Sequence, residues 1–159
     1  MDLLEPGTEV PARHPRKSSS RPSARFVLLT DLPLRVNRAA DVPAPTRVTW
    51  RLMAANNRSI GQAGAIFPGI EECLAGIERI RGSVRAVTVS VQFHCGAFSS
   101  DGSHWTWTVF LHQVPVATSS HRYKRRLECE RALRQFLDAV DRGAALPVDG
   151  TPRRLGRRL

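Results

Sequence analysis

The 159-residue sequence lacks any hydrophobic run of the roughly 18 to 20 residues that a membrane-spanning helix needs, so we expect no contact with a membrane. Its first ten residues are acidic and interrupted by proline, unlike a secretory signal, which favours a cytoplasmic location. Only three cysteines occur, Cys73, Cys95 and Cys129, and none belongs to a Cys-x-x-Cys pair. We therefore expect reduced thiols rather than disulfides, and neither a metal nor a cofactor.

Motifs of the common enzyme classes are missing as well. The sequence contains no Gly-x-Ser-x-Gly, no Walker-type phosphate loop, no dinucleotide-binding glycine motif and no His-Glu-x-x-His. Nucleophilic hydrolysis, nucleotide-dependent chemistry and metalloprotease chemistry thus have no support from motifs. This favours a non-enzymatic function and leaves an enzyme as the alternative.

Lysine is scarce, occurring only at Lys17 and Lys124, so nearly all of the 24 basic residues are arginines. Against 14 acidic residues they give a formal net charge of +10. Such a charge attracts polyanions, nucleic acid among them, through the release of counterions. A composition rich in Arg, Ala, Gly and Pro is also what a GC-rich genome produces, so the charge alone assigns no partner.

The two ends of the chain have the composition of disordered segments. Residues 1–24 contain four prolines and a run of Lys, Ser and Arg, and residues 144–159 end in the arginine-rich stretch TPRRLGRRL. Segments of this kind bury too little apolar surface to offset the entropy lost on ordering. We interpret them as a basic arm and a basic tail that flank one domain over 25–143.

Alternating apolar and polar residues predict the strands of the second half. The segment 85–96 alternates over its whole length, which predicts a strand with one buried and one solvated face. Asp101-Gly102 is a turn signal, and the alternating segment 105–111 behind it completes a predicted hairpin. A third, short strand is expected at 116–118.

A helix is predicted over 124–140, because its apolar residues recur at the spacing of one helical stripe. The stripe includes Cys129, Leu133 and Phe136, and Gly143 is expected to end the helix.

The first half repeats this plan. A leading strand is expected within Phe26 to Val36, residues 48–54 alternate, Asn56-Asn57 forms a turn that tolerates left-handed backbone, and residues 70–80 carry a helical stripe. A shift of 57 residues aligns Trp50 with Trp107, and a shift of 56 aligns Phe67 with Tyr123 and Cys73 with Cys129. We therefore predict an α+β fold of two tandem βββα repeats, with copies at about 25–84 and 85–143, whose single antiparallel sheet carries both helices on one face in pseudo-twofold symmetry.

With these two repeats, the sequence resembles the YegP-like family of small bacterial proteins, which carry one or two copies of a short repeat of unknown function. The resemblance rests on the strand and turn that run from Trp50 to Asn57, on the stretch that ends at Phe67, and on the second copy from Trp107 to Tyr123 with its helix. It covers about residues 47–140. The family usually has Asn-Gly in the turn, where this chain has Asn56-Asn57 and, in the second copy, His112-Gln113. The resemblance implies the duplicated α+β fold and brings no catalytic residue with it.

Histidine and cysteine supply the remaining candidates for chemistry. His94, His104 and Asp101 could meet at the mouth of the hairpin, with His94 expected opposite Thr106, and they form the alternative enzyme or metal site. Cys73 and Cys129 lie on the apolar stripes of the two helices, where a free cysteine acts as a small buried hydrophobe.

Four permanent cations, Arg122, Lys124, Arg125 and Arg126, stand at the start of the second predicted helix. The helix dipole disfavours cations there, so the placement requires nearby acids or an anionic partner. These four residues are our candidates for anion binding.

Trp50, Trp105 and Trp107 are expected in the core, which leaves mainly hydroxyl and amide side chains on the open face of the sheet and no evident platform for stacking bases. The sequence thus favours an uncharacterised interaction module that binds anionic macromolecules, such as nucleic acid, weakly and without sequence preference through its basic arms. We expect a monomer, with a homodimer through an exposed edge strand as the alternative.

Overall fold

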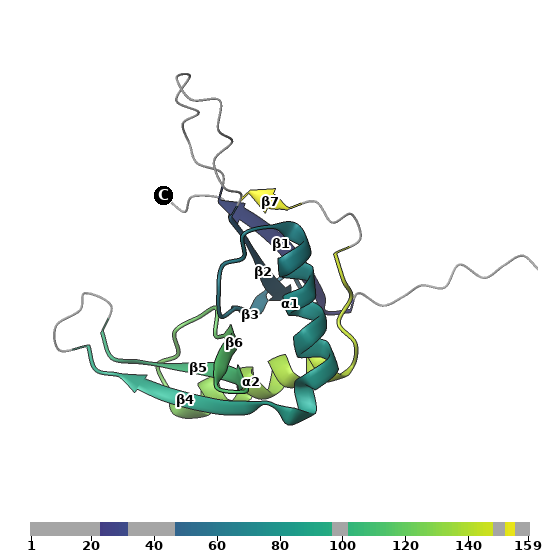
Figure 1. The fold of residues 1–159 in the computed structure, drawn as a ribbon. Helices are drawn as coiled ribbons and strands as arrows, with labels where there is room; N and C mark the ends of the chain where they lie inside the picture. Colours follow the sequence, from purple (N-terminus) through teal and green to yellow (C-terminus); the bar gives the residue numbers. More distant parts are fainter. Residues whose placement is uncertain (1–22, 32–46, 97–101, 148–151, 155–159) are drawn as a thin grey trace, which may run out of the picture.

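The computed structural model describes residues 23–31, 47–96, 102–147 and 152–154 (Figure 1). In chain order the elements are β1 (Arg25–Asp31), β2 (Arg47–Met53), β3 (Ser59–Ala63), α1 (Ile70–Ser83), a single 3-10 turn (Val84–Ala86), β4 (Thr88–His94), β5 (His104–Leu111), β6 (Val114–Thr118), α2 (Arg126–Asp141) and β7 (Arg153–Arg154). The predicted α+β class is confirmed. No helix in the described ranges has the length and apolar character needed to cross a membrane.

All seven strands belong to one sheet, in the order β4-β5-β6-β3-β2-β1-β7. The first six strands of this order pair antiparallel, as predicted, and only the short β7 runs parallel to its neighbour β1. β3 and β6 join the two halves of the sheet through the pairs Gln62–Thr118 and Ala63–Ala117.

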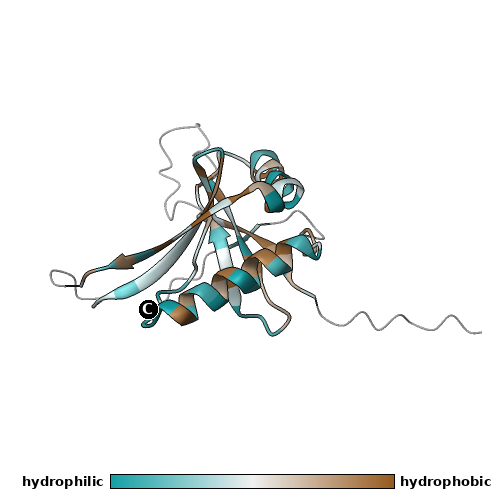
Figure 2. Cartoon of the chain, turned by 90° about the horizontal axis from the view of Figure 1, so that it is seen from below, coloured by the Kyte–Doolittle hydropathy of each residue, from teal (hydrophilic) through white to brown (hydrophobic). Residues whose placement is uncertain are grey.

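Apart from Ile60, which lies at the irregularity between β2 and β3, the buried strand residues follow one face of this sheet. Residues paired across neighbouring strands project to the same face, so the pairs Leu52–Gly61 and Ala63–Ala117 connect that face from β2 to β6. On it, Phe136 of α2 contacts the rings of Trp50 and Trp107. The buried residues of α1 belong to the same core, so both helices cover this face. Figure 2 shows brown strand segments running between two helices that each alternate brown and teal.

β4 departs from the predicted burial. Its alternating residues were expected to have one dry face, yet Val89 is 48% and Phe93 54% exposed, and Cys95 beyond the strand is exposed too. The reason lies in the topology, because β4 is the outermost strand and α2 packs mainly on β5 and β3. The alternation therefore identified the strand correctly but not its degree of burial.

The tail predicted to be disordered from residue 144 is ordered in part. Ala144 is buried, the Ala145 amide donates to the Ala24 carbonyl (2.9 Å), and the Phe26 amide donates to the Ala145 carbonyl (2.8 Å). Further on, β7 pairs with Leu29 and Thr30 of β1. The prediction was wrong for these residues because backbone pairing to a free strand edge requires no side-chain pattern. Of the predicted arm, residues 1–22 lie outside the described residues.

The turn between β5 and β6 consists of two residues, His112 and Gln113, flanked by the pair Leu111–Val114. Both have left-handed backbone, with φ of 50° and 67°. In the turn between β2 and β3, Asn57 adopts φ of 62°, as the sequence predicted for Asn56-Asn57. Asparagine and histidine adopt this conformation more readily than most residues, whereas glutamine is strained in it, and glycine suits it best.

Replacing His112 by Asn and Gln113 by Gly should relieve that strain. We expect the free energy of unfolding to rise by about 1 kcal/mol, measured by urea denaturation. As a matched control, Asn57→Gln should lower it by a similar amount. A double variant less stable than the parent chain would show that the turn is not strained.

Gly61 of β3 lies directly under the aromatic core. A Cβ atom there would stand 2.4 Å from Cδ2 of Phe136 and 2.9 Å from the Trp107 ring, closer than real Cβ atoms come to other atoms. Gly82 in α1 offers the opposite case, since nothing lies within 4 Å of its Cβ position.

Gly61→Ala should therefore destabilise the fold and Gly82→Ala should stabilise it. We expect a loss of about 2 to 3 kcal/mol in the free energy of unfolding for the first, from overpacking. For the second we expect a gain of about 0.5 to 1 kcal/mol, because alanine restricts the unfolded chain in an exposed helix. Thermal and urea unfolding measure both, and equal effects of the two variants would contradict the packing described for Phe136.

Candidate functional site

The mouth of the β4–β5 hairpin brings two of the three predicted histidine-site residues together. His94 and His104 are direct partners in the strand ladder, and their rings stack with centroids 4.9 Å apart. The expectation that His94 lies opposite Thr106 was wrong, since Thr106 pairs with Gln92. The strands stay paired up to His94–His104, and the linker expected over 97–103 lies beyond this pair, with residues 97–101 outside the described residues.

Each histidine already uses a ring nitrogen in a local hydrogen bond. His94 Nε2 lies 2.7 Å from Thr106 Oγ1, and His104 Nδ1 donates to the Gly102 carbonyl at 3.0 Å. Asp101, the third predicted member, lies outside the described residues. Within the described ranges no group of three His, Cys, Asp or Glu side chains is placed to hold a metal ion. The enzyme or metal site at this position stays a prediction.

The four anion-binding candidates lie at the beginning of α2 but mostly not in it. The helix starts at Arg126, and Arg122, Lys124 and Arg125 occupy the segment before it, where Arg125 has extended backbone. Tyr123 fixes this segment, because its amide and carbonyl both bond to the backbone of Trp105, at 3.0 and 2.7 Å. The sequence-based argument from the helix dipole therefore applies to Arg126 in the first turn and to Arg125 at the N-cap, and not to Arg122 and Lys124.

Arg126 has both an acidic and an aromatic partner. Its Nε donates to Glu130 Oε1 at 2.7 Å, and its guanidinium lies 5.7 Å from the centre of the Trp105 ring. Trp105 in turn contacts Phe93, with ring centroids 5.0 Å apart. Trp105 is only half-buried, contrary to the prediction that all three tryptophans lie in the core, where Trp50 and Trp107 are indeed buried.

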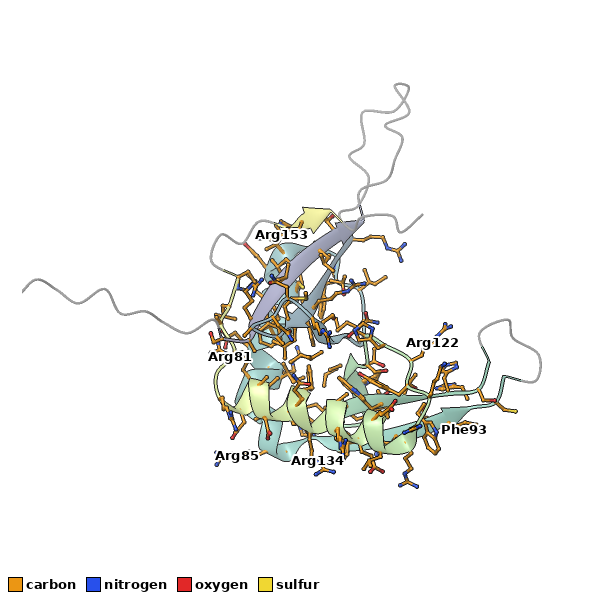
Figure 3. All side chains as sticks on the ribbon, turned by 180° about the vertical axis from the view of Figure 1, so that it is seen from behind. Arg81, Arg85, Phe93, Arg122, Arg134 and Arg153 are labelled. Atoms are coloured by element: carbon orange, nitrogen blue, oxygen red, sulfur yellow. The ribbon has the colours of Figure 1, made fainter. Side chains whose placement is uncertain are left out.

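Arg126 thus lies against the two rings, and the other three candidate cations precede it in the chain. We call this set of residues the basic–aromatic surface: Arg122, Lys124, Arg125, Arg126, Phe93 and Trp105. Figure 3 shows Phe93 and Arg122 at the same side of the molecule, away from Arg153. Sequence reasoning missed the aromatic part because alternation placed Phe93 and Trp105 in the core. The position of β4 at the sheet edge is what would have indicated that these two rings are accessible.

The open face of β4 and β5 is polar, as predicted. The pairs Ser90–Thr108 and Gln92–Thr106 place hydroxyl and amide side chains there, and Thr88 pairs with Phe110. This face opposes the one that carries the helices.

Cys73 and Cys129 are fully buried at matching places on α1 and α2, as predicted for small core residues. Burial raises the pKa of the Cys73 thiol to about 12. Burial and the neighbouring Glu130 charge raise the pKa of Cys129 to about 11. Both residues are therefore neutral thiols at physiological pH, whereas Cys95 is exposed.

Thiol labelling should distinguish these sites. Near pH 8 we expect a maleimide reagent to modify Cys95 rapidly in the folded chain, and Cys73 and Cys129 only after denaturation, because the thiolate is the reacting form. Mass spectrometry gives one adduct before unfolding and three after it. A Cys95→Ser variant should give none in the folded state, and rapid labelling of that variant would contradict the burial of the other two thiols.

No family model matches the sequence, and no curated protein does. Among solved structures, the chain is similar to the solution NMR structure of YegP from E. coli, a protein of unknown function. The TM-score is 0.53 at 11% sequence identity, and the match covers 85% of this chain and 97% of that one. The resemblance to YegP-like proteins inferred from the sequence is thereby confirmed at the level of the fold.

Proposed function

We propose that the chain is a non-enzymatic interaction module that binds single-stranded nucleic acid through the basic–aromatic surface. The observation that carries this proposal is the contact of Arg126 with the half-buried Trp105, whose ring in turn contacts the exposed Phe93. Proteins that bind single strands without sequence preference combine these two features, with cations along the phosphates and rings on which bases stack.

The charge of the domain predicted over 25–143 supports this assignment. Residues 25–143 contain 16 Lys and Arg and 10 Asp and Glu, which accounts for +6 of the net charge of +10. Lys124 and Arg125 are exposed, and the ion pairs among the described residues engage neither of them. They are therefore available for phosphate contacts, which give affinity without reading sequence.

The aromatic pair supports a single strand over a duplex. Phe93 is 54% exposed, and its ring is tilted by 47° against that of Trp105. A base can stack on an exposed ring only if it is not already stacked within a duplex, as in the loops and unpaired segments that RNA-binding proteins recognise.

The terminal segments contribute less charge than the domain. Residues 1–24 have four basic and three acidic residues, and residues 144–159 have four and one. We assign to them the weak, sequence-independent attraction predicted for basic arms, as an addition to the basic–aromatic surface.

We also propose that the domain arose as a tandem duplication of a βββα unit with pseudo-twofold symmetry. Local features that recur at matching positions support this. Val48 exchanges two backbone hydrogen bonds with Phe67, as Trp105 does with Tyr123. The Cys73 amide donates to the Gly69 carbonyl at 3.2 Å, and the Cys129 amide donates to the Arg125 carbonyl at the same distance. As a duplicated unit the chain would be a monomer, and the edge of β4 is the place where a second copy would pair.

Fluorescence anisotropy with labelled oligo(dT) and a duplex of the same length tests the nucleic-acid proposal. We expect micromolar binding to the single strand, weaker binding to the duplex, and a loss of affinity of roughly 50-fold between about 50 and 200 mM salt if four phosphates are neutralised. Replacing Arg122, Lys124, Arg125 and Arg126 by Gln should remove most of this salt dependence.

Two matched controls accompany the test. A variant with Gln at Arg79, Arg131, Arg134 and Arg142 loses the same charge elsewhere and should retain most of the affinity. Phe93→Ala should weaken single-strand binding about fivefold or more through lost stacking, whereas Val89→Ala on the same strand should not. Equal losses from both charge variants, or equal affinity for single strand and duplex, would refute the proposal.

A further inference from the structure

A polar cleft opens where the two halves of the sheet separate. The chain after β6 diverges from the beginning of β3, because on this side the pairing of the two strands ends at Gln62–Thr118. His121 spans the gap, its Nε2 donating to the Ser59 carbonyl at 3.0 Å. The resulting cleft has a volume of about 790 Å³, within the range of small-molecule sites.

The lining of the cleft is cationic and free of carboxylates. Arg51 and Arg58 contribute its positive charge, His121, Asn56 and Asn57 add polar groups, and none of its lining residues in the described structure is Asp or Glu. A concave surface with cations and without acids concentrates a positive potential. Guanidinium groups bind phosphate oxygens with several hydrogen bonds at once.

Two hydroxyl groups in the lining lack partners. The Oγ atoms of Ser59 and Ser120 are buried and have no hydrogen-bond partner among the described residues, although a buried hydroxyl is normally satisfied. They lie on segments far apart in the sequence that meet at this cleft. Rotation about χ1 is enough to turn a serine hydroxyl toward a ligand oxygen.

One side of the cleft is less polar. Met53, Ile60 and Tyr123 line it beside the cations, and α2 contributes Ala132. Burial raises the pKa of the Tyr123 phenol, which keeps this group a neutral donor at physiological pH. The lining thus combines an anion-binding part with a part that suits an organic group.

We propose that this cleft binds a small organic phosphate, with the phosphate group held by Arg51 and Arg58 and by the hydroxyls of Ser59 and Ser120. The organic part lies against Met53, Ile60 and Tyr123. The site is separate from the basic–aromatic surface, since it uses none of the six residues that define that surface.

NMR titration of the ¹⁵N-labelled full chain tests this proposal with AMP, inorganic phosphate and adenosine as probes. AMP should shift the amides of Arg58, Ser59, Ser120 and His121 and bind at least about fivefold more tightly than inorganic phosphate, and adenosine should bind far more weakly than AMP. Shifts confined to residues 122–126, or equal affinities for AMP and adenosine, would overturn the proposal. So would equal affinities for AMP and inorganic phosphate.

Single substitutions test which residues of the cleft hold the phosphate group. Arg58→Gln, in an exposed turn, should lower the affinity for AMP about tenfold or more, because a charged hydrogen bond is lost. Arg51→Gln should have a similar effect, and Arg79→Gln on the outside of α1 should have none. Oligo(dT) binding should be unchanged in Arg58→Gln, which separates failure of this site from failure of the basic–aromatic surface. Unchanged affinity for AMP in both Arg58→Gln and Arg51→Gln would refute the assignment.

Discussion

Phe136 of α2 packs against Trp50 of β2 and Trp107 of β5, with ring centroids 6.4 and 4.9 Å away, and all three side chains are buried. The two tryptophans belong to different halves of the sheet, so one helical residue joins both halves into a single core. Gly61 makes this possible by leaving space under the Phe136 ring. Phe26 extends the cluster, with its ring edge-on to Trp50 at 5.2 Å. The position of α2 over the centre of the sheet follows from this packing, and with it the place where the basic segment before the helix meets β5.

Much of this arrangement could be predicted from the sequence, because period-two and helical patterns report directly on which side chains face a core. The two helical stripes, the hairpins and the buried Cys73 and Cys129 all followed from such patterns. The exposure of Phe93 could not, since alternation shows which residues share a face and not whether a helix covers that face. The pairing of Ala145 and β7 with β1 could not be predicted from side-chain spacing either, because it depends on backbone groups alone.

The candidate sites, too, could be predicted from the sequence only in part. The sequence identified the basic residues 122–126, whose charge is local information. It could not identify their neighbours, because Trp105 and Phe93 come close only through the pairing of β4 with β5 and of Tyr123 with Trp105. The phosphate cleft depends even more on tertiary structure. Its arginines and hydroxyls come from segments about 60 residues apart, which the pairing of β3 with β6 brings together and which diverge beyond Gln62–Thr118 to leave the cleft.

The C-terminal segment has a consequence for self-association. Ala145 and β7 lie along the outer edge of β1, so the described sheet ends in the seven-residue β4 on one side and in the two-residue β7 on the other. Fibre growth by strand addition requires two free edges on each molecule, one to receive and one to offer. Among the described strands, β4 offers a long edge and β7 a very short one, so strand addition is favoured as a closed pair with β4 against β4. The few residues that cover β1 thereby shorten the edge that open-ended growth would need.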